Sequence, residues 1–544
     1  MKHLAGALVL LIATAVNPLA VAAAAPSVAA TELATSTLAA VRRAGGGAAW
    51  QRFAMLAAQG RIVTSGLPGR WRRVDDLRGG RYSTATDVSA FRVAEGNDGS
   101  KHWRQDPSGA VHSLNAPFAL AATATDAWLA ERGWLRKDSA SAAIGQAETR
   151  SEEGHRYDVV TMTPRAGQPI ELWFDSSSHQ LARTVRQMPI SVQTVRYGDY
   201  RKVAGLPLPF RIETRDSASS DVETITVESW RPARFATSRT FTAPAPPDDT
   251  ELVGDTRVEL DVDGFVTLPA RLNGKLFEFI LDTGGHDIIT PAVAAKLGLQ
   301  PLGHGASGGA GAGQLVEQHV RVETLQIGAA TLRHQHFYVL PLQYSTVERG
   351  ARPELGGLLG LELFERLRGR IDYAGRALTL SRFGSASLAP PAHEVPIVFD
   401  DDIPLLVGRI GADPGLFAID TGNSGSTVVQ ARWARRNGLA EAMKRGIETV
   451  SYGAGGASRN WVSRVAMLEI GDARIAHLIG RYAEDEAGAF SSRTEAGNIG
   501  TDVLSGFVVD IDYGRGVIGF EARPGYVAPP FSRTGFRAIK EDAA

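Results

Sequence analysis

Two copies of one short motif are the part of the sequence that could perform chemistry. Asp-Thr-Gly occurs at 282–284 and again at 420–422, 138 positions later, each time directly after an apolar stretch. A single Asp-Thr-Gly is more often an ordinary turn, in which the aspartate accepts backbone N–H bonds and the glycine takes a positive φ. Two such loops facing each other would instead bring two carboxyl groups together. Because adjacent carboxyls cannot both ionise cheaply, one proton is shared, and the pair offers an acid and a base at the same moment.

The motif belongs to a longer internal repeat. Three further matches keep the same order and nearly the same spacing, pairing 296–299 with 436–439, 325–328 with 468–471, and 371–373 with 511–513. Four such matches indicate a tandem duplication of a unit of about 135 residues. A duplication places equivalent loops across a pseudo-twofold axis, so the two carboxyls are expected to face each other.

Each copy is predicted to be mostly β. The first copy begins with alternating apolar and polar runs, 266–272 and 277–281, around Asn273-Gly274, a dipeptide that favours a tight hairpin. A single clear helix is predicted at 290–299, whose first residue, a threonine, is a candidate N-cap. Its counterpart in the second copy is expected from about residue 429 to 437. Strands dominate the rest of both copies.

The two loops, together with the later apolar segments 358–361 and 499–503, resemble the two lobes of a pepsin-like or retropepsin-like aspartic protease. The resemblance covers about residues 255–524. It implies a mainly β, bilobal fold, the pepsin-like double β-barrel, in which each lobe contributes one aspartate. It also implies an aspartic endopeptidase, which hydrolyses peptide bonds with a water molecule that the two carboxyls activate.

The resemblance identifies Asp282 and Asp420 as the expected catalytic residues. The shared proton is assigned to neither, because the pair titrates as a unit. The neighbouring threonines would brace the facing turns through hydroxyl-to-backbone bonds, and the neighbouring glycines would permit close backbone approach. These supporting residues are Thr283, Gly284, Thr421 and Gly422, with Gly360 and Gly500 expected beneath the turns.

Two glycine-rich stretches, 303–313 and 452–456, lie at equivalent places in the two copies. The corresponding segment of the family is a β-hairpin flap that folds over the substrate. A plain flexible loop and a phosphate-binding loop are the alternatives, although neither stretch has the Gly-Lys-Ser/Thr pattern of the latter. The flap candidates are Gly308, Gly309, Gly311 and Tyr452.

Three residues depart from the pattern of the family. Gly285 and Asn423 stand where serine, threonine or alanine is more usual, and Asn498 replaces an apolar residue before Ile499-Gly500. These departures lie next to the motifs, so they would affect the efficiency of catalysis.

The region 31–240 differs from the repeat. Helical spacing at 32–59 is followed by short alternating runs, a pattern that favours an antiparallel sheet with helices near its start. The segments 96–107 and 197–212 resemble the LolA-like, lipoprotein-sorting fold, a curved antiparallel sheet covered by helices that holds acyl chains on its concave face. The resemblance implies a lipid or lipopeptide ligand; a structural or propeptide-like companion of the protease is the alternative.

The remaining boundaries follow from composition. A short apolar stretch after Lys2 and His3, followed by small residues, predicts a cleaved signal peptide rather than a membrane anchor, and hence an exported, periplasmic or secreted protein that is soluble after cleavage. The predicted parts are a signal peptide at 1–25, the LolA-like domain at 31–240, a proline-rich linker at 241–250, lobe 1 at 251–388, lobe 2 at 393–524 and a C-terminal tail at 525–544.

Composition excludes several classes of chemistry. The 544 residues include 58 Lys plus Arg and 59 Asp plus Glu, so the net charge of -1 argues against a nucleic-acid partner. The absence of cysteine excludes disulfides, zinc–thiolate sites, iron–sulfur clusters and thiol nucleophiles. No cofactor and no metal are expected. His334 and His336 are interpreted as surface residues, Asp400–Asp402 as a solvated acidic cluster, and Asp372 and Asp512 as turn or strand-end residues.

The expected partner is a peptide or protein substrate. The tandem lobes make a second subunit unnecessary, so a monomer is expected. Two alternatives to the peptidase remain: a periplasmic lipid, lipopeptide or peptide binding protein with a protease-like fold and little activity, and an inactive scaffold.

Overall fold

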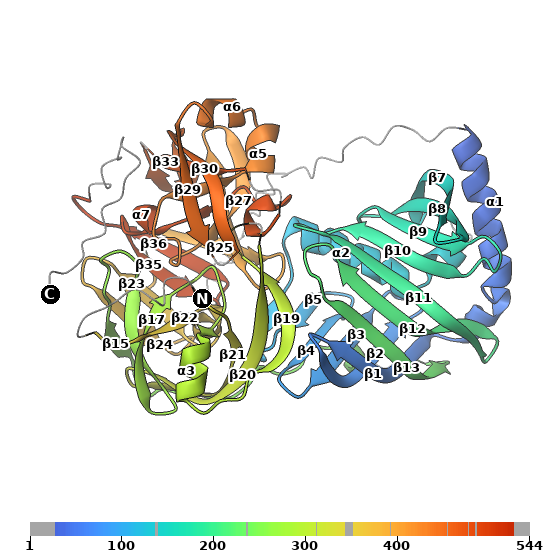
Figure 1. Ribbon diagram of the computed structural model, residues 1–544, viewed down its shortest axis with the longest axis horizontal. Coiled ribbons are helices and arrows are strands. Elements are labelled where there is room, and N and C mark those ends of the chain that lie inside the picture. The colour runs from blue at the N-terminus through green and yellow to red at the C-terminus, as the bar shows by residue number, and fades with distance from the viewer. Residues whose placement is uncertain are drawn as a thin grey trace, which may run out of the picture.

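The computed structural model describes residues 28–136, 140–235, 238–309, 311, 313–342, 352–391, 393–453, 455–476, 478–484 and 487–526. Three β-sheets make up most of this part of the chain (Figure 1). The predicted signal peptide and residues 527–544 of the predicted tail lie outside the described residues. No helix in the described ranges is both long and apolar enough to cross a membrane.

The N-terminal region forms a thirteen-strand antiparallel sheet, as expected from its alternating runs. The strands run outward from β1 to β6, and the chain returns from β7 to β13, which pairs with β1. Two helices pack against this sheet through a cluster of buried side chains that includes Leu38, Trp128 and Phe174. The elements are α1 (Val28–Ala44), β1 (Met55–Thr64), β2 (Leu67–Asp76), β3 (Tyr82–Val88), β4 (Arg92–Asn97), β5 (His102–Gln105), β6 (Val111–Ser113), α2 (Pro117–Ala130), β7 (Ala142–Glu152), β8 (His155–Pro164), β9 (Ile170–Asp175), β10 (Leu181–Gln187), β11 (Val192–Val203), β12 (Leu206–Asp216) and β13 (Val222–Ala233).

The first lobe contains a closed barrel of six strands. The barrel closes because β20 is long enough to pair with β16 at one end and with β21 along most of its length. The elements of this lobe are β14 (Thr250–Glu251), β15 (Thr256–Glu259), β16 (Thr267–Leu272), β17 (Lys275–Leu281), β18 (Ile288–Ile289), α3 (Pro291–Lys296), β19 (Leu302–Gly308), β20 (Gln314–Ile327), β21 (Ala330–Val339), β22 (Leu355–Leu359), α4 (Leu361–Phe364), β23 (Arg368–Asp372) and β24 (Ala377–Ser381).

The second lobe repeats this strand order, but two shorter strands replace the long β20 of the first lobe. β30 and β31 take the place of β20, and the lobe is part of a fifteen-strand sheet rather than a separate second barrel. Its elements are β25 (His393–Phe399), β26 (Pro404–Ile410), β27 (Asp413–Ile419), β28 (Thr427–Gln430), α5 (Ala431–Arg436), α6 (Ala440–Met443), β29 (Ile447–Gly453), β30 (Gly456–Arg464), β31 (Leu468–Ile470), β32 (Ala473–Ile475), β33 (Ile479–Ala483), β34 (Gly497–Ile499), α7 (Thr501–Leu504), β35 (Phe507–Asp512) and β36 (Val517–Ala522).

The two lobes share a sheet at their base. β23 of the first lobe pairs antiparallel with β35 of the second, so the repeated Ile-Asp-Tyr segments lie side by side. Across this junction the buried Arg368 donates to both carboxylate oxygens of Asp510, at 2.8 Å each. Asp372 and Asp512 accept backbone N–H bonds in the turns that follow β23 and β35, as expected for strand-end residues. One hydrophobic cluster runs through both lobes.

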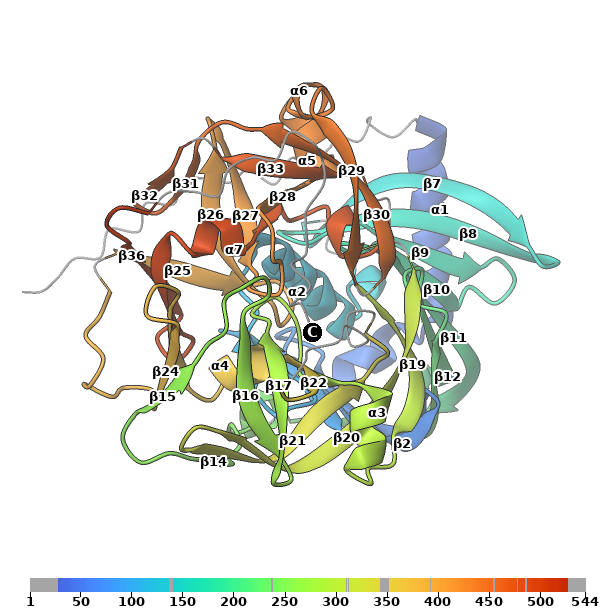
Figure 2. The same ribbon diagram turned by 60° about the vertical axis from the view of Figure 1, so that its left-hand side comes forward.

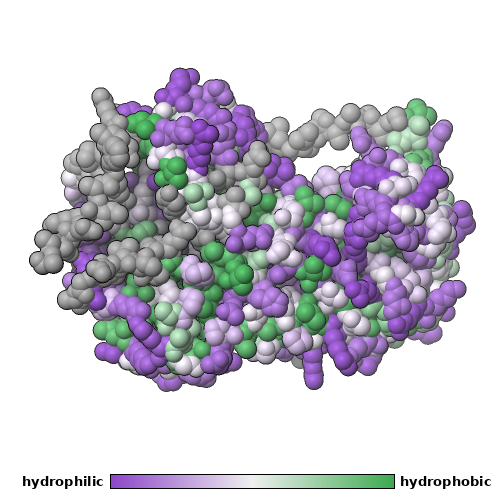
Figure 3. Space-filling model, viewed as in Figure 1, coloured by the Kyte–Doolittle hydropathy of each residue, from purple (hydrophilic) through white to green (hydrophobic). Residues whose placement is uncertain are grey.

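The surface view in Figure 3 shows hydrophilic residues interspersed with small groups of hydrophobic ones over both halves of the molecule. Such a mixture is ordinary for globular proteins. The predicted linker packs on the N-terminal sheet: Phe241 is fully buried, and its carbonyl accepts from Trp103 Nε1 at 2.8 Å.

Candidate active site

The two Asp-Thr-Gly loops meet where the lobes face each other. Asp282 directly follows β17, and Asp420 directly follows β27. Each of these strands pairs in parallel with a later strand of its own lobe, β22 or β34, which fixes the point at which the loop leaves the sheet. Gly284 N donates to Asp282 Oδ1 at 3.0 Å, and Asn423 N donates to Asp420 Oδ1 at 2.9 Å.

Two buried threonines join the loops. Thr283 N donates to Thr421 Oγ1 (3.1 Å), and Thr421 N donates to Thr283 Oγ1 (3.0 Å). Each hydroxyl in turn donates to the carbonyl that precedes the opposite aspartate: Thr283 Oγ1 to Ile419 O at 2.8 Å, and Thr421 Oγ1 to Leu281 O at 2.6 Å. The four bonds form a symmetric cross-link between the lobes.

The glycines of the motif are needed for the close approach of the two loops. A Cβ atom at Gly284 would lie 2.7 Å from Asp420 Cγ, and one at Gly422 would lie 2.5 Å from Asp282 Cγ. Each glycine therefore faces the carboxyl group of the other lobe. The structure thus brings together all six residues that the motif predicts.

The supporting glycines lie directly beneath these loops. A Cβ atom at Gly360 would lie 2.3 Å from Gly285 O, and one at Gly500 would lie 2.4 Å from Gly425 O. Any side chain there would push the aspartate loops out of position.

The environment of the carboxyls favours a shared proton. Burial, the negative charge of Asp420 and a hydrogen bond between the two carboxyl groups raise the pKa of Asp282 well above its usual value. The carboxamide of Asn498 donates to Asp420 Oδ2. Sequence reasoning marked Asn423 and Asn498 as departures from the pattern but assigned them no role.

A charged cluster flanks Asp282. His286 Nδ1 lies 3.0 Å from Glu362 Oε1, and His286 Nε2 lies 3.5 Å from Asp402 Oδ2. Although burial lowers it, the charges of Asp402 and Glu362 raise the pKa of His286 well above its usual value. The imidazole is therefore a cation beside the Asp282–Asp420 pair, which is called the dyad below.

The expectation of a solvated cluster at Asp400–Asp402 is wrong for Asp400 and Asp402, which are half-buried, whereas the Asp401 side chain is exposed. Asp400 accepts from Thr494 Oγ1 at 3.0 Å, Asp401 pairs with Arg104 of the N-terminal sheet, and Asp402 faces His286. Each of the three carboxylates therefore has a different partner.

The glycine-rich stretches form hairpins whose tips touch. The first joins β19 to β20 and contains Gly308, Gly309 and Gly311; the second joins β29 to β30 (Figure 2). Gly313 N donates to Gly455 O at 2.7 Å. The backbone of Tyr452 lies in β29, and its side chain lies outside the described residues.

The N-terminal sheet holds the first hairpin, a contact that sequence reasoning did not find. His304 N donates to Ser65 O (2.9 Å), and Ala306 N donates to Asp221 Oδ2 (2.9 Å). Ser65 and Asp221 lie in turns between neighbouring strands at one end of the sheet. No local pattern signals a contact between segments so distant in sequence.

His336 is not a surface residue. It is buried, and its Nε2 lies 3.2 Å from Nδ1 of the buried His319. Burial lowers the pKa of His336 to about 3 and that of His319 to about 4, so both are neutral at physiological pH. His334 is exposed, as expected, and lies 2.9 Å from Glu323.

One cluster among the described residues has the composition of a metal site. Asp106, His112 and Glu365 have donor atoms within 4.8 Å of one another, between the N-terminal sheet and the first lobe. His112 Nε2 lies 2.9 Å from a carboxylate oxygen of each partner. Although burial lowers it, hydrogen bonds to Asp106 and Glu365 raise the pKa of His112 to about 10, so a protonated imidazole lies between the two acids.

Comparison with known proteins gives one family match. Residues 268–363, which include Asp282, the first hairpin and Gly360, match the profile of the family described as aspartyl protease. No curated protein matches the chain.

Three solved structures are similar to parts of the chain. A LolA superfamily protein from Nitrosomonas europaea is 18% identical, covers 39% of this chain and 97% of its own, and has a TM-score of 0.27. A DUF1329 family protein from Desulfovibrio piger is 10% identical, with coverage of 38% and 97% and a TM-score of 0.27. A retropepsin-like aspartic protease from Rickettsia conorii is 25% identical, with coverage of 24% and 92% and a TM-score of 0.19.

The cross-link predicts a large cost for losing one hydroxyl. Thr421→Val keeps the shape of the side chain but leaves the buried Thr283 N and Leu281 O without their partner. We expect the free energy of unfolding to fall by about 2–4 kcal/mol, measured by chemical denaturation. Thr421→Ser, which keeps the hydroxyl, is expected to lose about 1 kcal/mol. Equal losses in the two variants would contradict the role of the hydroxyl.

Proposed function

We propose that the protein is an aspartic endopeptidase with a bilobal, pepsin-like arrangement of its C-terminal half. Asp282 and Asp420 are its catalytic residues, and a peptide or protein is its substrate. The observation that carries this proposal is the threonine cross-link, which holds two carboxyl-bearing loops face to face. The aspartyl protease profile over residues 268–363 supports it.

The dyad can hydrolyse a peptide with one proton and one water molecule. The ionised carboxyl takes a proton from water as the water oxygen bonds to the carbonyl carbon, while the protonated carboxyl gives its proton to the carbonyl oxygen. In the resulting gem-diol, one hydroxyl gives a proton to the carboxyl that acted as the acid. The carboxyl that acted as the base then protonates the amide nitrogen as the C–N bond breaks. The products are a carboxylic acid and an amine, and the dyad again holds one proton.

We further propose that the protein acts as an exported monomer, periplasmic or secreted. The leader-like start of the sequence supports export. Both aspartates come from one chain, so a second subunit is not needed to complete the site.

Removing either carboxyl should abolish turnover. Asp282→Asn and Asp420→Asn each leave the dyad without its acid or its base, so kcat/KM for a cleaved peptide is expected to fall by about 10²–10⁴-fold. The double variant should lose little more than either single one, because each carboxyl works through the other. Thermal midpoints near that of the wild type serve as the control for folding. Substantial turnover in a single variant would rule out the dyad.

Turnover should follow a bell-shaped dependence on pH. The raised pKa of Asp282 means that its proton persists above the usual range of an aspartate and is lost as the pH rises through the raised value. Activity is then lost on the alkaline side as this proton leaves, and on the acid side as the second carboxyl is protonated. A flat profile between about pH 3 and 8, or inhibition by a chelator, would contradict this mechanism.

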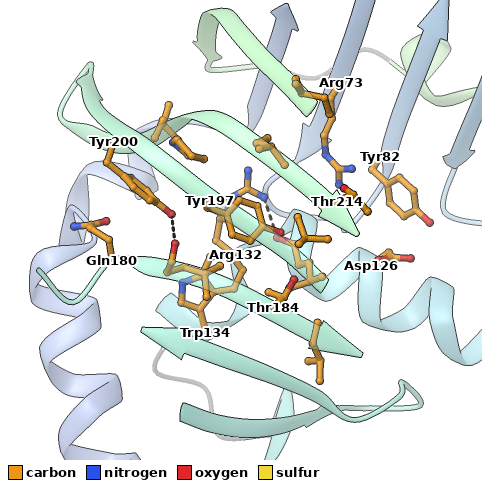
Figure 4. A pocket seen from close by; sticks show the side chains of 18 of the residues that line it. Arg73, Tyr82, Asp126, Arg132, Trp134, Gln180, Thr184, Tyr197, Tyr200 and Thr214 are labelled. Carbon is orange, nitrogen blue, oxygen red and sulfur yellow. Dashed lines mark hydrogen bonds between the residues drawn. The ribbon is translucent and has the colours of Figure 1, made fainter. Parts of the chain in front are cut away.

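A second function is proposed for the N-terminal sheet. A cavity of about 340 Å³ lies among the sheet and the two helices, and its wall includes the aromatic side chains of Trp134, Tyr197 and Tyr200 (Figure 4). Arg73 and Arg132 line it, and both are held by the fully buried Asp75: Arg73 Nε donates to one carboxylate oxygen at 2.8 Å, and Arg132 Nη2 donates to the other at 3.0 Å. We propose that the cavity takes the apolar part of a lipid or lipopeptide, with Arg73 beside its anionic group.

Dodecanoate tests this second function. Its binding should change the tryptophan fluorescence of the full-length protein, because Trp71 and Trp230 line the cavity. Arg73→Gln should weaken binding about tenfold through the loss of a charged hydrogen bond. Arg72→Gln, an exposed change on the same strand, should not. No fluorescence response and no bound dodecanoate by calorimetry would exclude the proposal.

A further inference from the structure

One asparagine makes the two halves of the dyad unequal. Asn498 lies in β34, where it pairs with Ala418 of β27, and its Nδ2 donates to Asp420 Oδ2. At the equivalent place in the first lobe, β22 pairs Leu358 with Ile280. A leucine side chain has no N–H to donate, so the carboxyl group of Asp282 receives no corresponding bond.

The orientation of the Asn498 carboxamide follows from its neighbours. Gly425 N donates to Asn423 Oδ1 at 3.1 Å, which identifies the other end of that side chain as the NH₂ group. Asn423 Nδ2 then donates to Ser426 O (2.9 Å) and to Asn498 Oδ1 (3.0 Å). Because Asn498 Oδ1 is the acceptor here, Asn498 Nδ2 must be the atom that faces Asp420.

The two carboxyls therefore receive different numbers of N–H bonds. Asp420 accepts from Asn423 N on Oδ1 and from Asn498 Nδ2 on Oδ2. Within the described part of the chain, Gly284 N is the single N–H donor to the carboxyl group of Asp282. Donors of this kind stabilise the ionised form of a carboxyl.

We propose that Asn498 is a positioning residue that keeps the shared proton on Asp282, which makes Asp282 the acid and Asp420 the base of the first step. This assignment rests on the peptidase function proposed above. In that step Asp420 takes the proton of water, and Asp282 gives its proton to the carbonyl oxygen of the substrate.

The other ionisable groups beside the dyad do not move the shared proton away from Asp282. On the side of the first lobe, the positive charge of His286 favours an ionised Asp282, but burial and the charge of Asp420 outweigh it in raising the pKa of Asp282. Glu362 and Asp402 are the direct partners of that imidazole. The buried Tyr373, which follows β23, stays neutral, because burial and the charge of Asp420 raise its pKa.

A measurement without turnover tests the role of Asn498. In the full-length Asp282→Asn variant one carboxyl of the dyad remains, and the infrared difference from Asp282→Asn/Asp420→Asn reports its ionisation as the pH is varied. Adding Asn498→Leu, which copies the leucine of the first lobe, should raise the midpoint of that titration by about one pH unit. Asn498→Ser, whose hydroxyl can donate, should raise it less. An unchanged midpoint in the folded leucine variant would overturn the proposal.

Kinetics provide the second readout. In otherwise wild-type protein, Asn498→Leu should move the acid limb of the kcat/KM profile upward by about one pH unit. Asn437→Leu, a matched change at the end of α5, should leave the profile unchanged. An acid limb that stays in place in Asn498→Leu would contradict the assignment. If the wild type cleaves no peptide, the peptidase proposal fails, while the infrared titration still decides where Asn498 directs the proton.

Discussion

The cross-link between Thr283 and Thr421 is the contact on which the rest of the site depends. Its four hydrogen bonds hold the ends of β17 and β27 close together. Because the two loops then lie so close, the residue after each threonine must be a glycine. The carboxyls are consequently held together in a partly buried place, which is why the pKa of Asp282 is raised. At the base of the lobes, the shared sheet and the buried Arg368–Asp510 pair resist any separation that would pull the loops apart.

The duplication gives the two lobes the same arrangement of strands and loops. The lobes differ in the side chains beside each aspartate and in the contacts of their hairpins. Beside Asp420 there are two asparagine side chains, whereas beside Asp282 there is a histidine held by two acids. The hairpins differ as well, since the first is bonded to the N-terminal sheet through Ser65 and Asp221. A single chain with two unequal lobes can give its two aspartates different tasks, which identical subunits cannot do before substrate binds.

Sequence patterns predicted the features that depend on neighbours in the chain. Asn273-Gly274 takes the positive φ values of a tight hairpin, and Thr290 caps α3 as expected, although the helix ends earlier, at Lys296. The predicted helical spacing at 32–59 fails after η1 (Gly47–Arg52), because residues from Met55 onward pair with β13 and β2. Long-range contacts had no local signal: the separate partners of Asp400–Asp402, the burial of His336 and the anchoring of the first hairpin all depend on segments far away in sequence.

We propose that this pair of aspartates hydrolyses peptide bonds. The most direct test is to incubate the purified protein, produced without the predicted signal peptide, with a diverse peptide library between about pH 3 and 8, and to identify the products by mass spectrometry. We expect internal cleavage by the wild type that disappears in Asp282→Asn/Asp420→Asn. Absence of cleavage at every pH, or the same products from the double variant, would contradict it.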